Sequence, residues 1–283
     1  MRRIWRTSKR DIDYGSKTLV MGILNLTPDS FSDGGKISSV DDGLRVVERM
    51  VAEGADILDI GGESTRPGSA RVSAAEEIAR VVPLISSVTK HFDIPVSIDT
   101  SKAEVAEAAV QAGAEIINDI SGLRFDERVA EIAVREKTAL VLMHLRGEFE
   151  TMHKQEPVAD IIAEVKNGLK WSTAKAHEFG VEDEQIALDI GLGFSKTFEQ
   201  NLELMAKIGD LCSEFADFPL LSGPSRKSFI GKLLGDAPVE ERLHGTMASV
   251  AVSVWNGANI IRVHDVKEAV ETARVVEAIK GQK

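Results

Sequence analysis

A six-residue pattern that occurs three times constrains the fold of this chain more than any other feature. GADILD at residues 54–59 recurs as GAEIIN at 113–118 and as GANIIR at 257–262. Each glycine can adopt the left-handed conformation that ends a helix, and the apolar residues after it are typical of a strand buried on both faces. The separation of the first two copies fits two βα units of ordinary length.

Short β-branched runs alternate with longer stretches of helical periodicity, which indicates repeated βα units on a parallel sheet. A doubly wound sheet is the rival architecture, but eight similar units without a detectable reversal favour a closed (β/α)8 barrel of the TIM type. We expect one domain, with an N-terminal extension at 1–18 packed on a barrel at 19–283. The expected strands are at 19–24, 57–60, 96–99, 116–120, 139–143, 186–190, 220–222 and 260–263.

Composition excludes several classes of partner. The 283 residues carry a net charge of −11, so no basic excess is present to neutralise nucleic acid or an anionic membrane. No apolar run is long enough to span a bilayer. The only cysteine is Cys212, and no apolar stretch follows the basic N-terminus, so we expect a reducing, cytoplasmic setting.

Polar residues end nearly every expected strand. Each one could simply cap the helix that follows, but a ring of them at one barrel mouth is costly unless a ligand or water satisfies it. The carboxyl ends of barrel strands carry the chemistry, so we expect a polar, ring-shaped ligand there. The strand-end residues are Asn25, Asp59, Glu63, Asp99, Asn118, Asp119, His144, Asp189, Ser222, Arg262 and His264.

The segment at residues 222–228 combines glycine, serine, arginine and lysine before an apolar helical pattern, which predicts an anion site unless a serine only caps the helix. The long polar segments at 27–39, 61–72 and 144–157 are candidate active-site lids. The remaining histidines are expected at the surface or at helix ends, and neither a hydrolytic triad nor a zinc motif is present. The stripe of Met247, Val250, Val254 and Trp255 is core or a dimer contact.

Two long motifs resemble the signatures of dihydropteroate synthases. MGILNLTPDSFSDGG at 21–35 is similar to the first signature, and DIGGESTRPG at 59–68 is similar to the second. SRKSF at 225–229 and RVHD at 262–265 also match, so the resemblance extends from residue 19 to the last expected helix. Pro224 and Phe149 depart from the family pattern without removing a chemical group that the reaction needs.

The resemblance implies a role for each matching residue. The pterin would be bound by Asp99, Asn118, Met143, Asp189 and Lys227. The diphosphate would be bound by Asn25, Thr65, Arg262 and His264, with Mg²⁺ beside Asn25. The 4-aminobenzoate would be bound by Phe31, Thr65, Pro67 and Ser228. Asp33 and Arg66 would complete a catalytic set that also contains Asn25, Lys227, Arg262 and His264.

The resemblance also implies the reaction, in which a pterin diphosphate and 4-aminobenzoate give dihydropteroate and diphosphate. We expect diphosphate to leave before the amine attacks, because the conjugated pterin ring stabilises the methylene left behind. Sulfonamides would compete for the benzoate pocket, and a homodimer is expected from the family.

Three other functions fit parts of the sequence. A pterin-binding methyl-transfer barrel would share Asp99, Asn118 and Asp189 but would not need residues 225–228, and a catalytically silent pterin-binding module would look similar at the rim. A Schiff-base aldolase would use Lys227, although Arg226 beside it favours an anionic partner. Diphosphate release separates the first two from a synthase, and borohydride trapping tests the third.

Overall fold

Eight parallel strands close into a barrel in the order β10-β3-β4-β5-β6-β7-β8-β9. This computed structural model describes residues 3–26, 39–66 and 68–282. The expected (β/α)8 barrel is confirmed, and each expected strand matches the observed one to within one residue at either end. The barrel strands are β3 (Leu19–Asn25), β4 (Ile57–Gly61), β5 (Val96–Asp99), β6 (Ile116–Asp119), β7 (Ala139–Met143), β8 (Ile186–Asp189), β9 (Leu220–Ser222) and β10 (Ile260–Val263).

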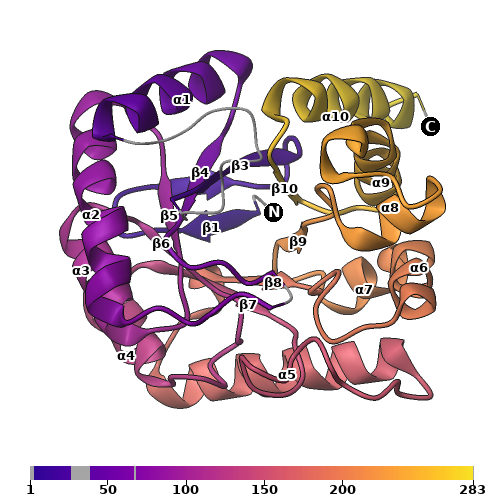
Figure 1. Cartoon of the computed structure of the whole chain (residues 1–283), viewed down its shortest axis with the longest axis horizontal. Helices are drawn as coiled ribbons and strands as arrows, with labels where there is room; N and C mark the ends of the chain where they lie inside the picture. The colour runs from indigo at the N-terminus through magenta and orange to yellow at the C-terminus, as the bar shows by residue number, and fades with distance from the viewer. Residues whose placement is uncertain (1–2, 27–38, 67, 283) are drawn as a thin grey trace.

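Helices surround the barrel and follow one another in chain order, as Figure 1 shows. Within the described ranges, no helix is long and apolar enough to cross a membrane. The helices are α1 (Val40–Glu53), α2 (Ala74–His91), α3 (Ala103–Gln111), α4 (Arg128–Glu136), α5 (Ile161–Phe179), α6 (Phe198–Ala206), α7 (Ile208–Glu214), α8 (Ser228–Leu233), α9 (Leu243–Trp255) and α10 (Val266–Lys280), with short 3-10 turns η2 (Asp183–Gln185) and η3 (Val239–Glu241).

The three glycines of the repeated hexapeptide adopt the conformation expected from the sequence. Gly54, Gly113 and Gly257 have φ angles of 99°, 111° and 103°. Gly54 directly ends α1, and a Cβ at Gly113 would lie 2.8 Å from Thr89 Oγ1. A side chain would therefore be strained at these positions, which explains why the same residue type opens each copy.

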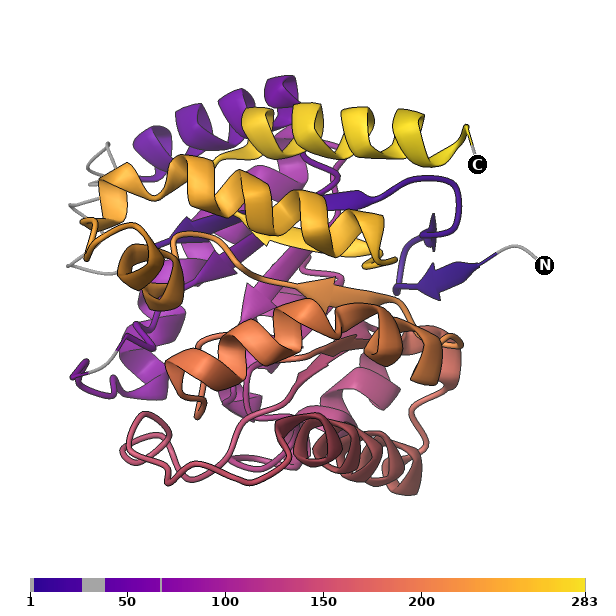
Figure 2. The ribbon, with the colours of Figure 1, turned by 90° about the vertical axis from the view of Figure 1, so that its right-hand side faces the viewer.

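An antiparallel hairpin of β1 (Ile4–Arg6) and β2 (Asp11–Asp13) lies outside the barrel sheet. Trp5 is fully buried, packs in a cluster with the interior residues Leu19 and Ile57, and donates its indole N–H to the carbonyl oxygen of Gln185 at 2.9 Å. These partners lie at or near the beginnings of barrel strands, so the hairpin covers the amino ends of the strands. Figure 2 shows the hairpin at the end of the barrel opposite α8.

Candidate active site

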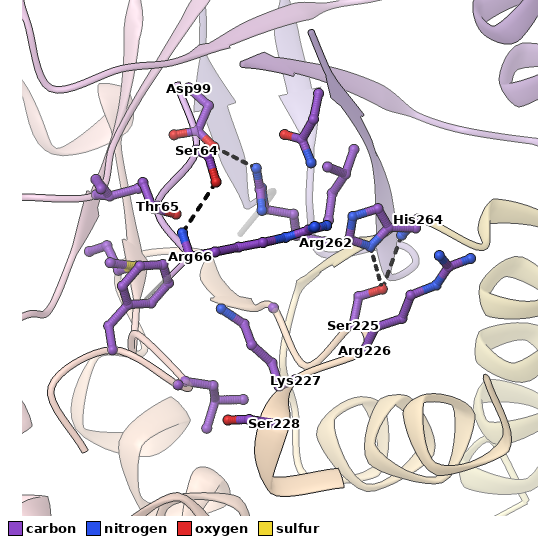
Figure 3. Close-up of a pocket in the computed structure, with 18 of the residues that line it drawn as sticks. Ser64, Thr65, Arg66, Asp99, Ser225, Arg226, Lys227, Ser228, Arg262 and His264 are labelled. Carbon is purple, nitrogen blue, oxygen red and sulfur yellow. Dashed lines mark hydrogen bonds and ion pairs between the residues drawn. The ribbon is translucent and has the colours of Figure 1, made fainter. Parts of the chain in front are cut away.

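A cavity of about 310 Å³ opens at the carboxyl ends of the strands. Figure 3 shows side chains converging on it from several segments, with Thr65, Asp99, Lys227 and His264 among them. Phe31, Asp33 and Pro67 lie outside the described residues. Every other residue expected in the site lines this cavity, namely Asn25, Thr65, Arg66, Asp99, Asn118, Met143, Asp189, Lys227, Ser228, Arg262 and His264.

Four of the polar residues expected to face the mouth do not line the cavity, so that part of the expectation is wrong. One of them, Asp59, is fully buried beneath residues that do line it. Successive side chains of a strand point to opposite faces, and Asp119, His144 and Ser222 each follow or precede a position that faces inward. The carboxylate of Asp119 accepts the backbone N–H groups of Ser121 and Leu123. His144 and Ser222 are buried outside the barrel interior, the latter against Ser253.

A charged network of strand-end side chains forms the floor of the cavity. The Nε atom of Arg262 donates to Asp59 Oδ2 at 2.6 Å, and its second terminal nitrogen donates to Asp99 Oδ2 at 2.7 Å. The amide nitrogen of Asn118 donates to the same Asp59 oxygen at 3.0 Å. Asp59 is fully buried, so it serves as the common acceptor that orients both Arg262 and Asn118.

The network explains how buried charges are tolerated here. Burial lowers the pKa of Arg262, but the carboxylates of Asp59 and Asp99 outweigh that effect and raise it well above its ordinary value. Burial raises the pKa of Asp99, and Arg262 opposes the rise. Because the guanidinium fork matches two carboxylates, its direct partners already balance much of its charge before any ligand enters.

Asp189 is the last residue of β8 and lines the cavity. One carboxylate oxygen, Oδ1, accepts the backbone N–H of Gly191 at 2.7 Å. Burial raises the pKa of Asp189, while this hydrogen bond and the charges of Lys227 and Arg262 lower it. The residue therefore shapes the turn after its own strand and also presents a carboxylate to the cavity.

A cationic group faces this acidic floor from the segment before α8. Lys227 is surrounded closely enough that burial lowers its pKa to about 8, and its ammonium nitrogen lies 4.1 Å from the ring centroid of Phe194. Ser228 is the first residue of α8 and is exposed to the cavity. Because α8 has only six residues, the positive potential of this region comes from its cationic side chains rather than from a helix dipole.

His264 and Ser225 form a second polar side of the cavity. The Ser225 hydroxyl is 2.9 Å from His264 Nδ1 and accepts the His264 backbone N–H at 3.1 Å. Burial lowers the pKa of His264 to about 3, with Arg226 and Arg262 contributing, so the imidazole is neutral near pH 7. A neutral ring whose Nδ1 accepts from Ser225 carries its proton on Nε2 and can donate it to an anion.

The sequence did not predict a role for His153, which was expected to be an ordinary surface residue. It is half-buried and lines the cavity, and its Nε2 lies 2.8 Å from the carbonyl oxygen of Thr65. Its ring also stacks on Phe194 with centroids 6.0 Å apart. His153 thus joins three separate segments, and no spacing in the sequence signals such a contact.

Glu63 is expected at the rim and does line the cavity, but its carboxylate has structural partners. It accepts the backbone N–H of Val72 at 2.7 Å and pairs with Lys102 at 2.8 Å. Lys102 also pairs with the buried Glu77 at 2.6 Å. These contacts fasten the segment after β4, which carries Thr65 and Arg66, to helices α2 and α3.

The structure offers a partial donor set for a cation at Asn25. A Cβ built on Gly61 would lie 3.5 Å from Asn25 Oδ1 and 3.6 Å from Asp99 Oδ2, so glycine leaves a small oxygen-lined space between the two. Within the described ranges, no three His, Cys, Asp or Glu residues form a group that could hold a metal. A cation that keeps waters and shares its ligands with a bound phosphate suits such a site better than a fully caged one.

Comparison with known proteins assigns the family. The chain matches the model of the pterin binding enzyme family over residues 21–264. It is 46% identical over 267 residues to the dihydropteroate synthase of Synechocystis sp., which covers 94% of this chain and 92% of the relative. The chain belongs to the dihydropteroate synthase family. It is therefore a transferase of folate biosynthesis.

Solved dihydropteroate synthases share the whole fold. The Yersinia pestis enzyme, in complex with a sulfonamide drug, superposes with a TM-score of 0.92 at 39% identity and covers 98% of this chain and 99% of its own. The Xanthomonas albilineans enzyme with 4-aminobenzoic acid gives a TM-score of 0.90 at 37% identity, with 99% of both chains covered. Membership of this synthase family decides against the methyl-transfer, silent-module and aldolase alternatives.

Proposed function

We propose that this dihydropteroate synthase binds the pterin on the floor of the cavity, holds its diphosphate against the cationic side, and releases diphosphate before 4-aminobenzoate attacks. The observation that carries the proposal is the arrangement of charge. Carboxylate and amide groups of Asp99, Asn118 and Asp189 line the same cavity as the cationic groups of Lys227 and Arg262, at the strand ends. Such a cavity complements a polar heterocycle that carries an anionic tail.

The pterin ring fits the acidic floor. Its amino-pyrimidinone edge presents adjacent N–H groups, and the Asp189 carboxylate offers acceptors that can pair with them. Asp99 and Asn118 would bind further ring atoms from neighbouring strands, and Met143, which is buried at the end of β7, would pack on the ring face. Lys227 would donate to a ring oxygen or nitrogen.

The diphosphate would bind at the edge of this floor, where Arg262 lines the cavity together with His264, Asn25 and Thr65. A neutral His264 would donate its Nε2–H, and Arg262 retains N–H groups beyond the two that Asp59 and Asp99 accept. Asn25 would hold Mg²⁺, with phosphate oxygens and water as the remaining ligands. When bound, Mg²⁺ would neutralise the charge that builds on the leaving diphosphate.

The 4-aminobenzoate would lie beside the pterin, near Ser228, Thr65 and Phe194. Its carboxylate would meet the Ser228 hydroxyl, and its ring would contact Phe194. Phe31 and Pro67 would contribute to the same pocket. A sulfonamide presents a similarly placed anionic group, so we propose that it competes at this position.

The reaction needs position and charge stabilisation rather than a strong base. The carbon–oxygen bond between the pterin methylene and the diphosphate breaks, and the electron pair leaves with the diphosphate. The amine nitrogen then forms the new carbon–nitrogen bond and loses one proton to solvent. Because the arylamine is neutral at working pH, the pocket contributes mainly by aligning it with the methylene, with Arg66 and Asp33 completing the site from the segments around it.

Diphosphate release on addition of both substrates tests the activity. We expect one diphosphate for each dihydropteroate formed, with a requirement for Mg²⁺. Release of diphosphate without dihydropteroate, or no release with both substrates, would contradict the proposed activity.

Isotope scrambling tests the order of bond breaking. We expect a label in the bridging oxygen of the pterin diphosphate to move into non-bridging positions when 4-aminobenzoate is absent, because the bond breaks and re-forms. Retention of the label together with normal turnover would favour direct displacement by the amine.

We also propose a homodimer formed through α9 and α10. Val250 and Val254 of the expected stripe are buried in the core, and Met247 packs against it, so these three do not form a contact surface. Exposed apolar side chains instead include Val252 and Trp255 on α9, and Val275 and Ile279 on α10, and these helices pack against each other. Light scattering on Val252→Glu should show a monomer where the wild type shows a dimer, and a monomeric wild type would contradict the proposal.

A further inference from the structure

The turn between β8 and α6, residues 190–196, packs closely against the end of β7. Gly191 has a φ angle of 68°, and a Cβ there would lie 2.0 Å from the carbonyl oxygen of His144. Ser195, four residues later, also has a positive φ of 55°. The turn therefore passes tightly against the end of β7, and the backbone strain at Ser195 persists only where surrounding contacts fix it.

Lys196 supplies such contacts. Its ammonium nitrogen lies 2.7 Å from the carbonyl oxygen of Gly191 and 2.9 Å from that of Phe194. It also lies 3.1 Å from the ring nitrogen Nδ1 of His144 and 3.3 Å from the His144 carbonyl oxygen. An ammonium has three protons, so acceptors on the turn and on the end of β7 can use all of them.

His144 acts as an acceptor in this cluster. Burial, together with the positive charges of Lys196, Arg124 and Arg146, lowers the pKa of His144 to about 2. The ring is therefore neutral, and because Nδ1 accepts from Lys196 its proton lies on Nε2, 4.0 Å from Glu164. His144 neither lines the cavity nor titrates near pH 7, so its role is to receive Lys196.

The turn that Lys196 holds supports two parts of the proposed site. The Gly191 N–H fixes the Asp189 carboxylate at 2.7 Å, and the Gly191 carbonyl is one of the Lys196 acceptors. The Phe194 carbonyl is another, and the Phe194 ring lies against Lys227, which points into the cavity in Figure 3. Displacing the turn would therefore move the proposed pterin acceptor and the aromatic wall together.

We propose that Lys196 is a positioning residue of the synthase: by joining the Gly191 and Phe194 carbonyls to His144, it holds Asp189 and Phe194 in their working places. The proposal rests on the pterin-binding role proposed for Asp189. Lys196 touches neither substrate in this assignment, so it acts through the turn and through its charge.

The charge of Lys196 gives this role a signature that a purely structural contact lacks. Lys227, Arg262 and Lys196 each lower the pKa of Asp189, against the effect of burial. The pKa of Lys196 itself is lowered by burial and by the charges of Lys227 and Arg146, and it is raised by Asp189 and Glu164. Removing the Lys196 charge should therefore raise the pKa of Asp189, and pterin binding should be lost at a higher pH when the enzyme is acidified.

Steady-state kinetics of Lys196→Met across about pH 5 to 9 test the proposal, because kcat/KM reports groups of the unliganded enzyme. We expect the KM for the pterin diphosphate to rise at least tenfold, with a smaller change in kcat, and the acid limb of kcat/KM to move to higher pH. Lys196→Arg, which keeps the charge, should leave the acid limb in place. Lys9→Met is the matched control. Lys9 also donates to a backbone carbonyl, that of Gly113 at 2.7 Å, but it lies in the N-terminal hairpin at the other end of the barrel, so neither KM should change.

The outcomes separate the inference from the function on which it rests. A lower melting temperature with an unchanged KM and pH profile would show that Lys196 is only structural and would overturn the inference. If Asp189→Asn raises the pterin KM while Lys196→Met does not, the inference fails and the proposed function stands. If neither variant changes the KM, the role of Asp189 fails as well. Lys196→Gln, which keeps a donor but no charge, serves if Lys196→Met does not fold, and it should show the same shift of the acid limb.

Discussion

On the pterin side of the cavity, Asp59, Asp99, Asn118 and Arg262 come from strand ends and bind one another directly. On the arylamine side, Thr65, Phe194 and Ser228 come from segments that follow the strands, and Thr65 and Phe194 are linked through His153. The strand ends are fixed by the parallel register of the barrel, whereas the segments depend on a few long-range contacts.

This difference indicates where each half of the site obtains its precision. The pterin side is organised before any ligand binds, because the barrel already satisfies most of its charged groups. The arylamine side depends on contacts that each contribute little, so single substitutions there should change affinity modestly. We therefore expect the two halves to respond differently to substitution.

The largest effect is expected for Arg262→Ala. Loss of the guanidinium leaves Asp59 and Asp99 without their cation, and breaking a buried ion pair costs about 3–5 kcal/mol. We expect a large fall in the free energy of unfolding and loss of pterin diphosphate binding, measured by thermal melts and calorimetry. Unchanged affinity would remove Arg262 from the site.

Arg10→Ala provides the matched control at the other end of the barrel. Arg10 pairs with the buried Glu115 at 2.9 Å, so its removal also leaves a buried carboxylate without its cation. We expect this variant to be less stable than the wild type and to bind the pterin diphosphate normally.

A smaller but more selective effect is expected for Asp189→Asn. The amide oxygen can still accept the Gly191 N–H, so the fold should be kept, but the amide turns a donor toward the donors of the pterin. Pterin affinity should fall by about 2–4 kcal/mol, the cost of mispairing a buried charged hydrogen bond. A lower melting temperature with pterin affinity within about threefold of wild type, under 1 kcal/mol, would instead make Asp189 a turn residue.

Alkaline pH should weaken both halves moderately. A lysine whose pKa is lowered by burial is charged below that value and neutral above it. Burial lowers the pKa of Lys227 to about 8 and that of Lys196 to about 7, so kcat/KM should fall as the pH rises through this range. If one of these lysines is responsible, its replacement by arginine (Lys227→Arg or Lys196→Arg) should move the alkaline limb of the kcat/KM profile to higher pH. An alkaline limb that stays in place in both variants would exclude the two residues.

The smallest effect is expected for His153→Phe. Phenylalanine can keep the stacking on Phe194 but cannot bond the Thr65 carbonyl, so the variant removes one hydrogen bond worth about 1 kcal/mol. The KM for 4-aminobenzoate should rise about fivefold, which corresponds to that energy, while the pterin KM stays unchanged. Lys154→Ala, at the exposed neighbouring residue, is the control and should alter neither KM.

The barrel could be predicted from the sequence because its determinants are local. Three strands follow the helix-ending glycine of the repeated hexapeptide, and the other five are short β-branched or apolar runs, so the strand ends could be predicted to within one residue. The prediction that polar residues at strand ends face the cavity holds for Asn118 and Asp189. It is wrong for Asp119 and His144, because neighbouring residues of a strand point to opposite faces.

The contacts between segments could not be predicted in this way. His153 and Thr65 are 88 residues apart, and Lys196 and His144 are 52 apart, so no local pattern relates them. Asp59 was found at a strand end, but its position as the common acceptor of Arg262 and Asn118 depends on which strands meet across the barrel. Such partners follow from closure of the sheet rather than from spacing in the chain.

Titration calorimetry with the pterin alcohol, which lacks the diphosphate leaving group, tests the difference between the two halves most directly. It should be performed without 4-aminobenzoate on the wild type, His153→Phe and Asp189→Asn. We expect the wild type and His153→Phe to bind the pterin equally, and Asp189→Asn to bind it at least about thirtyfold more weakly, as a loss of 2 kcal/mol requires. The account would be contradicted if the wild type bound the pterin only after 4-aminobenzoate was added, or if both variants bound it equally weakly. Either result would mean that the pterin side is not organised before ligands bind.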